Sequence, residues 1–289
     1  MPIAYTQRLE IEYEERNPEA GETVVLVHGF PDDARTWDAV LELPEFADKR
    51  AIVPWLRGFG ATRFRDPIAP RTAGTGALAR DVIDLLDALG IERCTLVGHD
   101  WGARAGYAAA VLAPERFELL IAMSVGYATN VPSQTMEYDQ AHAYWYQWFF
   151  ATSRGETALT NERRALCRYL WRTWSPSWRF DDGEFERTAA AFDNPDFVPV
   201  VLHSYRRRWG FAPPDPRDVL DDAKLAGNPA IAVPTVVLHG DEDGATLPSA
   251  TSDKERYFTG GYERRVIGGA GHFVQREAPH VVAAALSGP

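Results

Sequence analysis

The sequence contains little cysteine and no long apolar run, and each shortage excludes a class of protein. Its 289 residues include two cysteines, Cys94 and Cys167, which lie far apart and outside any Cys-x-x-Cys motif. They predict no disulfide framework and suggest a reducing compartment. No segment approaches the roughly 20 apolar residues that a membrane helix needs, and the first residues lack the basic and apolar regions of a secretory signal. We therefore expect a cytoplasmic protein without a membrane partner.

Positive charge is also scarce. The chain has 30 Lys and Arg residues against 41 Asp and Glu residues, so its formal net charge is −11. An acidic protein repels the phosphate backbone, which argues against a nucleic-acid partner. The run Arg206-Arg207-Arg208 is short, and we interpret it as a solvated or salt-bridged helix face. The histidines show no metal-ligand spacing, so we expect neither a metal nor an organic cofactor.

Strand-like and helix-like segments alternate in the first part of the chain and again near its end. Apolar runs such as Thr23–Val27, Cys94–Val97 and Thr235–Leu238 have the length of strands, whereas Thr75–Leu89 has apolar residues at helical spacing. Such alternation predicts a mostly parallel sheet covered by helices. The other expected strands are Leu9–Glu14, Ala51–Trp55, Leu119–Val125 and Glu263–Ile267, and the other expected helices of this part are Trp101–Leu112 and Arg276–Leu286.

The alternation stops in the middle of the chain, where tryptophan becomes frequent. Six of the nine tryptophans lie between Ala128 and Pro229. The segments Gln140–Phe150, Glu162–Trp174 and Asp196–Arg208 in this region look helical. We expect an α/β core made of residues 1–128 and 230–289, interrupted by a helical cap at residues 129–229.

The most informative motif is Gly98-His99-Asp100-Trp101-Gly102, which follows an expected strand and opens an expected helix. The Gly-x-nucleophile-x-Gly pattern is typical of a nucleophile elbow, a sharp turn that raises one side chain into a pocket. An aspartate there is ionised at neutral pH and needs no base to activate it. A carboxylate attacks best at a saturated carbon bearing a leaving group, and the product is an ester. Asp100 is therefore the candidate nucleophile, and we expect His99 to be buried and structural.

Two later loops supply candidates for a base and for its acidic partner. His272 lies on the glycine-rich loop Gly268–Phe273 after one expected strand, and the acidic loop Asp241–Asp243 follows another. A neutral imidazole can deprotonate the water that hydrolyses an ester, and a carboxylate can hold its ring. The order nucleophile, acid, histidine is that of the α/β-hydrolase triad. The residues of the acidic loop alone leave Asp241, Glu242 and Asp243 open as the acid.

With these motifs, and with His28-Gly29-Phe30-Pro31 near its start, the sequence resembles α/β-hydrolase-fold enzymes of the epoxide hydrolase and haloalkane or haloacetate dehalogenase group. The resemblance implies an α/β-hydrolase fold, with a mostly parallel eight-stranded-type sheet and an inserted cap. It assigns the acid to Asp243 and the oxyanion hole to the backbone N–H groups of Phe30 and Trp101, with a cis peptide before Pro31. Trp101, Trp148 and His28 are the candidate substrate contacts, although we expect His28 chiefly to shape its loop.

The leaving group distinguishes the chemistries of this group. An epoxide oxygen leaves as an alkoxide that needs a proton, whereas a halide needs only weak donors such as tryptophan indoles. The segment Trp145–Phe150 resembles the epoxide hydrolase segment that carries one ring-opening tyrosine, which selects Tyr146, with Tyr144 as its competitor. The segment Ser204-Tyr205-Arg206 resembles the one that carries the second. We therefore predict hydrolysis of an apolar epoxide to a vicinal diol, with Tyr146 and Tyr205 polarising the ring oxygen.

A haloalkane or haloacid dehalogenase that forms the same ester on Asp100 is the alternative. Many haloalkane dehalogenases have a halide-contacting asparagine where this chain has Phe30. Haloacetate dehalogenases have an arginine in place of Trp101 and a histidine in place of Gln147, and Arg104 matches only their second arginine. A remote alternative is a non-catalytic ligand receptor with a hydrolase fold. Each implies a small-molecule ligand, bound by a monomer or a homodimer.

Overall fold

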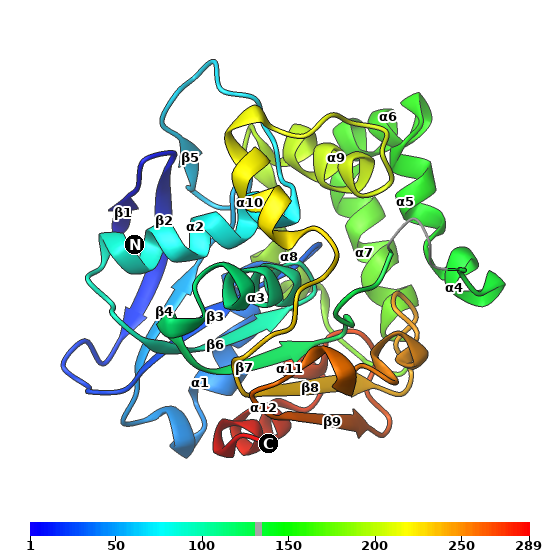
Figure 1. The fold of residues 1–289 in the computed structure, drawn as a ribbon. Coiled ribbons are helices and arrows are strands. Elements are labelled where there is room, and N and C mark those ends of the chain that lie inside the picture. Colours follow the sequence, from blue (N-terminus) through cyan, green and yellow to red (C-terminus); the bar gives the residue numbers. More distant parts are fainter. Residues whose placement is uncertain (131–134) are drawn as a thin grey trace.

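A single sheet forms the centre of the protein (Figure 1). The computed structural model describes residues 1–130 and 135–289. Within them, nine strands join in the order β1-β2-β4-β3-β6-β7-β8-β9, with β5 paired to β2. The strands are β1 (Ile3–Tyr5), β2 (Leu9–Arg16), β3 (Thr23–Val27), β4 (Arg50–Pro54), β5 (Arg63–Phe64), β6 (Cys94–His99), β7 (Phe117–Met123), β8 (Thr235–Gly240) and β9 (Tyr262–Ile267).

The sheet is parallel from β4 to β9 and antiparallel at its other edge, where β1, β4 and β5 pair with β2. In the centre, Val97 of β6 lies opposite Leu26 of β3 and Ile121 of β7. The residues of β3 and β8 are buried along nearly their whole length, as expected of parallel strands covered on both faces. The predicted fold class is confirmed. Because these strands are parallel, the loops after β3, β6, β8 and β9 leave the same edge of the sheet.

The helices of the core form two groups. α2 (Thr75–Ala88) and α3 (Trp101–Leu112) pack against each other beside the sheet, and α1 (Asp38–Leu41), α11 (Val274–Glu277) and α12 (Pro279–Ala284) contact one another. The bounds of α2 and α3 agree with the predicted helices to within one residue. The helix that follows the elbow therefore begins where the motif places it.

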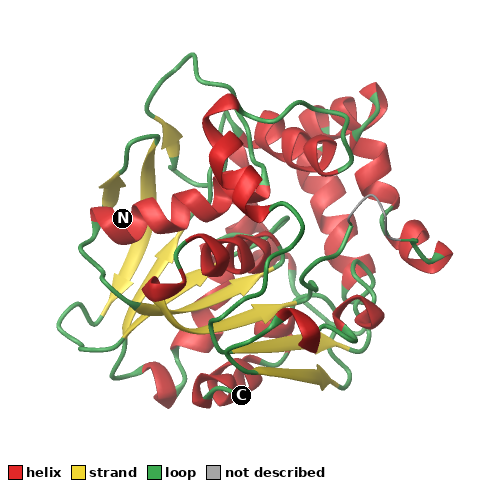
Figure 2. Cartoon of the chain, viewed as in Figure 1, coloured by secondary structure: helices red, strands yellow, loops and turns green. Residues whose placement is uncertain are grey.

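Helices inserted between β7 and β8 stand at the end of the sheet to which the arrowheads of β6, β7 and β8 point (Figures 1 and 2). In the described part of the chain they are α4 (Tyr138–Ala143), α5 (Trp145–Phe150), α6 (Ser153–Asn161), α7 (Arg163–Trp174), α8 (Asp182–Ala189) and α9 (Phe197–Arg208). A further inserted helix, α10 (Val219–Leu225), packs against α2 and α3 instead. Their place agrees with a helical insertion. The cap range 129–229 stays a prediction, and its positions 131–134 lie outside the described residues.

Two predicted helices are interrupted, so both predictions were wrong in extent. The expected helix Arg276–Leu286 is divided between α11 and α12. Pro279 has no N–H to continue the helical hydrogen bonds and disfavours a helical backbone at Ala278, where φ is −143° and ψ is 61°. The expected helix Gln140–Phe150 divides at Tyr144 into α4 and α5. The helices α6, α8 and α10 have no predicted counterpart, because their short polar sequences offer few apolar positions.

Both cysteines are buried and free. Burial raises the pKa of each thiol, so both stay protonated and unreactive at neutral pH. Among the described residues, no helix combines the length and the apolar character that crossing a membrane requires.

Glycines at the elbow permit a close backbone crossing, which generates a stability prediction. A Cβ on Gly102 would lie 2.1 Å from the carbonyl oxygen of Val27. We expect Gly102→Ala to lower the free energy of unfolding by about 2–3 kcal/mol, because a packed backbone cannot move aside as a flexible side chain can. Urea unfolding followed by tryptophan fluorescence would measure the change. Gly21→Ala is the control, since no atom of the described residues outside its chain neighbours would lie within 4 Å of its Cβ, and an equal loss in both variants would contradict the prediction.

Candidate active site

Asp100 stands at the turn between β6 and α3, where the sequence predicts the nucleophile. Its backbone has φ 48° and ψ −107°, a conformation that costs free energy in a residue with a side chain. Its amide donates a hydrogen bond to the carbonyl oxygen of Met123 at 3.1 Å. The residue is buried, with 4% of its surface exposed. Strain of this kind persists where the surrounding structure holds a side chain in one place.

His272 and Asp243 form a buried pair beside Asp100. The Nδ1–H of His272 donates to the two carboxylate oxygens of Asp243, at 2.9 and 3.0 Å. The backbone N–H groups of Ala245 and Thr246 donate to Asp243 Oδ1 at 2.8 and 2.9 Å. The other two acids of this loop, Asp241 and Glu242, are exposed. The geometry therefore favours Asp243 as the partner of the histidine.

The charges of the pair prepare His272 to accept a proton. Burial alone would lower the pKa of His272, but the Asp243 carboxylate raises it above its usual value, with a further contribution from Asp100. Burial alone would raise the pKa of Asp243, but His272 and His239 hold it well below its usual range. The Nε2 atom of His272 lies 4.0 Å from Asp100 Oδ2 and has no hydrogen-bond partner among the described residues. The unbonded nitrogen therefore faces the candidate nucleophile.

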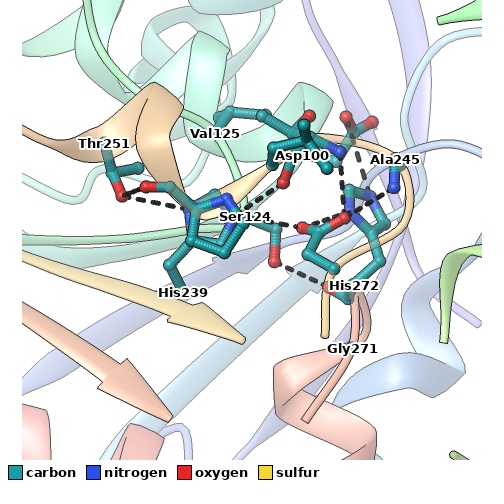
Figure 3. A network of polar contacts seen from close by, with 12 residues as sticks. Asp100, Ser124, Val125, His239, Ala245, Thr251, Gly271 and His272 are labelled. Carbon is teal, nitrogen blue, oxygen red and sulfur yellow. Dashed lines mark hydrogen bonds and ion pairs between the residues drawn. The ribbon is translucent and has the colours of Figure 1, made fainter. Parts of the chain in front are cut away.

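Contacts to its main chain hold the loop that carries His272 (Figure 3). Its carbonyl oxygen accepts hydrogen bonds from His99 Nε2 at 2.8 Å and from Ser124 Oγ at 2.6 Å. Its amide donates to the carbonyl oxygen of Trp174, at the end of α7, at 3.1 Å. Burial lowers the pKa of His99 to about 4, so this ring is neutral at pH 7. His99 thus has the buried place that the sequence predicts.

A backbone donor binds the other side of the Asp100 carboxylate. The Phe30 N–H donates to Asp100 Oδ1 at 3.1 Å, and the Phe30–Pro31 peptide is cis, as the resemblance implies. Trp101 is the first residue of α3, where an N–H group has no acceptor within the helix. One oxygen of Asp100 is therefore bound by a backbone donor, while the other faces His272.

The two predicted lid tyrosines meet edge to face, with the ring centroids of Tyr146 and Tyr205 5.4 Å apart. Tyr205 OH accepts a hydrogen bond from Trp101 Nε1 at 3.3 Å, and Tyr146 OH accepts one from Gln147 Nε2 at 2.9 Å. Burial raises the pKa of both phenols, and the Asp100 carboxylate contributes to the increase in each. Both hydroxyls are therefore protonated and lie within the electrostatic field of the candidate nucleophile.

The hydrogen-bond partners of the two tyrosine hydroxyls show that each hydroxyl oxygen is an acceptor. An indole N–H can only donate, so Tyr205 is the acceptor in its bond with Trp101. Trp209 Nε1 donates to Gln147 Oε1 at 2.9 Å, and this orients the amide so that its Nε2 donates to Tyr146. In the described part of the chain, neither tyrosine hydroxyl donates to an acceptor. Each therefore receives a hydrogen bond from the protein and keeps its own hydrogen for another acceptor.

The structure does not bring every predicted residue into this group. Trp148 packs on Trp209, with ring centroids 4.4 Å apart, and donates its Nε1–H to a backbone carbonyl of α4. Tyr144, the competing lid tyrosine, also packs on Trp209. His28 uses both ring nitrogens on backbone groups, because Nε2 accepts the Leu56 N–H at 3.0 Å and Nδ1 donates to the next carbonyl at 2.9 Å. The polar atoms of the Trp148 and His28 side chains are thus bonded to backbone groups, and their contact with substrate stays a prediction.

Two residues that the sequence does not indicate as site residues complete the surroundings, Gln147 and Trp174. The Trp174 ring lies 4.9 Å from the His272 ring and 4.8 Å from the Tyr146 ring, measured between centroids. Its Nε1 is buried and has no hydrogen-bond partner within the described residues. The neighbours of Trp174 come from segments far apart in the chain, so no local pattern indicates its contacts. Gln147 is adjacent to Tyr146 in sequence, but its orientation depends on the distant Trp209.

The arrangement offers a nucleophile, a base and donors for developing negative charge. Asp100 can form an ester, His272 can deprotonate water, and the Phe30 N–H can stabilise charge on the Asp100 carboxyl oxygen. In the regions that the structure describes, no group of three or more His, Cys, Asp or Glu side chains is placed to hold a metal ion.

Proteins similar to this chain in sequence or in fold include named epoxide hydrolases. A model of the alpha/beta hydrolase fold family matches residues 22–279. Epoxide hydrolase A of Mycobacterium tuberculosis is 28% identical over 93% of this chain and 91% of that protein. An epoxide hydrolase of Caballeronia sordidicola is 39% identical, but the match covers 41% of this chain and 35% of that protein. A crystal structure of a candidate epoxide hydrolase from Klebsiella pneumoniae has a TM-score of 0.93 at 34% identity, over 99% of this chain and 95% of that chain.

The family match includes the positions of Asp100, Asp243 and His272. It extends from the start of the parallel sheet to the last helix, and the similarity of the Klebsiella structure covers nearly the whole fold. This chain is a hydrolase that belongs to the alpha/beta hydrolase fold family.

Proposed function

We propose that this protein hydrolyses an epoxide to a vicinal diol through an ester on Asp100. The observation that carries the proposal is the pair of buried hydroxyls on Tyr146 and Tyr205, whose hydrogens are free for an acceptor. An epoxide oxygen is such an acceptor, and it requires a donor because an alkoxide is a poor leaving group. The relatives named epoxide hydrolase support the same activity.

In the first step, Asp100 attacks a ring carbon and the carbon–oxygen bond of the epoxide breaks. Oδ1 is held by the Phe30 N–H, so Oδ2 is the attacking atom. The released oxygen takes a proton from one of the two tyrosines, Tyr146 or Tyr205, and the other stabilises it by a hydrogen bond. The product of this step is a hydroxyalkyl ester of Asp100.

In the second step, His272 removes a proton from water, and the resulting hydroxide attacks the carbonyl carbon of the ester. The N–H groups of Phe30 and Trp101 stabilise the negative charge that develops on Oδ1. Asp243 stabilises the imidazolium form of His272. The ester then breaks to release the diol and restore the Asp100 carboxylate, and the proton on His272 returns to the tyrosinate through solvent. No step uses a cofactor.

The same proposal assigns residues 1–128 and 230–289 to the core that supplies the nucleophile and base. Residues 129–229 form the cap that supplies both tyrosines. Phe30 and Phe150 pack against Tyr205, and such aromatic surroundings favour an apolar small-molecule substrate. The two free cysteines fit a cytoplasmic location. The proposal is compatible with a monomer and with a homodimer.

Halide displacement through the same ester is the second candidate. The observation that favours it is the indole N–H of Trp174, which is buried without a partner among the described residues and lies beside Tyr146 and His272. Two indoles, those of Trp101 and Trp174, could then share a halide. Epoxide hydrolysis is preferred because the indole N–H of Trp101 already donates its hydrogen bond to the Tyr205 oxygen.

His272→Gln should trap the ester, because Asp100 can still attack while no base activates water. With an aryl epoxide such as styrene oxide, the intact mass should increase by the mass of the epoxide, and turnover should fall by about 10²–10⁴-fold. Asp100→Ala is the control and should acquire no adduct. Wild-type protein is assayed in parallel for diol and for halide. Release of halide from a haloalkane without diol from any epoxide would contradict the proposed function.

The acidic limb of the pH profile should report His272, which accepts a proton only when neutral. Since Asp243 raises the pKa of His272, ester hydrolysis should decline as the pH falls through that raised value. Asp243→Asn removes the negative charge, so the decline should move to lower pH while the maximal rate falls. Single-turnover ester hydrolysis at different pH values measures both effects. Asp241→Asn should leave the limb in place, and an unmoved limb in Asp243→Asn would show that the acid lies elsewhere.

Gln147 should control the direction of the Tyr146 hydroxyl. Gln147→Leu removes the donor to Tyr146, and we expect kcat/KM for an epoxide to fall about tenfold. Gln147→Glu places an acceptor there, which takes the Tyr146 hydrogen away from the substrate, so its loss should be larger. A role in packing alone predicts the reverse order, because glutamate has nearly the shape of glutamine. Measuring kcat/KM and thermal unfolding for both variants separates the two explanations.

A further inference from the structure

A second hollow shares one wall, the Trp101 side chain, with the candidate active site. It is a cavity of about 230 Å³, lined by residues at the start of α2, on α3 and at the end of α9. In the part of the chain that the structure describes, three arginines line it, namely Arg104, Arg207 and Arg208, together with a single carboxylate, that of Asp222. The cavity therefore contains more positive than negative charge, although the protein as a whole is acidic.

Among the described residues, only one of the three arginines has a carboxylate partner. Arg207 Nη2 pairs with Asp222 Oδ2 at 3.2 Å. Arg208 donates to Gln147 Oε1 at 3.4 Å, and its guanidinium carbon lies 4.9 Å from the centroid of the Tyr205 ring. An amide oxygen and a ring face orient the Arg208 guanidinium but do not neutralise it.

Arg104 is the least compensated of the three. Its single hydrogen bond among the described residues is a 3.4 Å contact from Nη1 to Thr129 Oγ1, and its buried Nε has no partner there. Burial lowers the pKa of Arg104, and the Arg208 cation lowers it further, while the Asp100 carboxylate acts in the opposite direction. A guanidinium nevertheless remains protonated in proteins. The residue is half-buried, and a partly desolvated cation that forms no ion pair with a carboxylate of the described residues is costly. An anion from outside the chain would relieve this cost.

The N-terminus of α2 adds a fourth source of positive potential. This 14-residue helix has Gly74 at its N-cap, no side-chain cap and no acidic residue in its first turn. Ala73, Gly74 and Thr75 line the cavity. The N–H groups of a first helical turn and the helix dipole favour a bound anion. Asp222 is the competing carboxylate, because a Cβ on Gly76 would lie 2.8 Å from its Oδ1.

We propose that this cavity binds the anionic group, a carboxylate or a phosphate, of a small molecule. The uncompensated guanidinium groups of Arg104 and Arg208 and the start of α2 supply the positive charge, and Ser204, which also lines the cavity, adds a hydroxyl. A carboxylate or phosphate accepts hydrogen bonds from several guanidinium and backbone donors at once. The anion is either a substituent of the substrate or a separate ligand, and both require the same chemistry of the site. The inference goes beyond the proposed hydrolysis, since binding needs no turnover.

Titration calorimetry with inorganic phosphate and with acetate, at constant ionic strength, tests the site in the unmodified protein. We expect saturable binding, weakened about tenfold or more by Arg104→Met and tightened about threefold by Asp222→Asn, which removes the competing charge. A folding defect cannot produce that tightening. Arg80→Met is the matched control, because Arg80 pairs with the neighbouring Asp221 at 2.8 Å and does not line the cavity. Its affinity for phosphate should equal that of the wild type.

Turnover of an epoxide carboxylate and of its primary amide distinguishes the two sources of the anion. If the anion belongs to the substrate, Arg104→Met raises KM for the carboxylate and leaves KM for the amide unchanged. If the anion is a separate ligand, Arg104→Met changes KM for the two epoxides to the same extent, while phosphate binding still depends on Arg104. The turnover comparison rests on the proposed function, whereas the calorimetric binding measurement does not. Absence of saturation up to about 10 mM, or equal binding to wild type and Arg104→Met, overturns the site whatever the turnover results.

Discussion

The close crossing of β6 and α3 is the constraint on which the site depends. Without side chains at Gly98 and Gly102, the strand and the helix approach until Gly102 reaches the backbone of Val27, and Asp100 between them takes its left-handed φ. A carboxylate raised on such a turn is buried, so its charge has to be met by groups of the protein instead of by water. The Phe30 N–H binds one oxygen and leaves the other free. The same burial that makes the carboxylate reactive therefore dictates which groups can surround it.

The helical insertion helps to hold the loops of the core in register as well as covering them. The carbonyl oxygen of Trp174, at the end of α7, accepts the N–H groups of Gly244 and His272 at 3.0 and 3.1 Å. One turn earlier, Trp171 Nε1 donates to the carbonyl oxygen of Pro31 at 2.7 Å. The last turn of α7 thus binds the acidic loop, the histidine loop and the loop of the Phe30 donor. A displacement of α7 cannot leave any of these three loops unchanged, because a buried backbone group that loses its partner is costly.

Features with local signals could be predicted from the sequence, and features that depend on packing between distant segments could not. The elbow and the histidine loop each follow a strand and carry glycines at fixed spacing, so their positions were predictable. Trp148 and Trp174 are both cap tryptophans, and only the rotation of α5 and α7 decides which of them reaches His272. The arginine run was predicted to be solvated or salt-bridged. Its first two members do pair with acids, whereas Arg208 packs on Tyr205 one turn earlier in α9 and donates to Gln147, a contact that appears only when α9 meets α5.

The hydrogen bond from the Phe30 N–H makes the two oxygens of Asp100 chemically different. In the proposed cycle Oδ2 departs with the diol and an oxygen atom from water replaces it, while Oδ1 stays with the protein. Each diol then contains an oxygen that entered as water one turnover earlier. The carboxylate is in this sense a reagent that is consumed and rebuilt at every cycle, and the first diol released by a fresh enzyme contains an oxygen atom incorporated when the chain was synthesised.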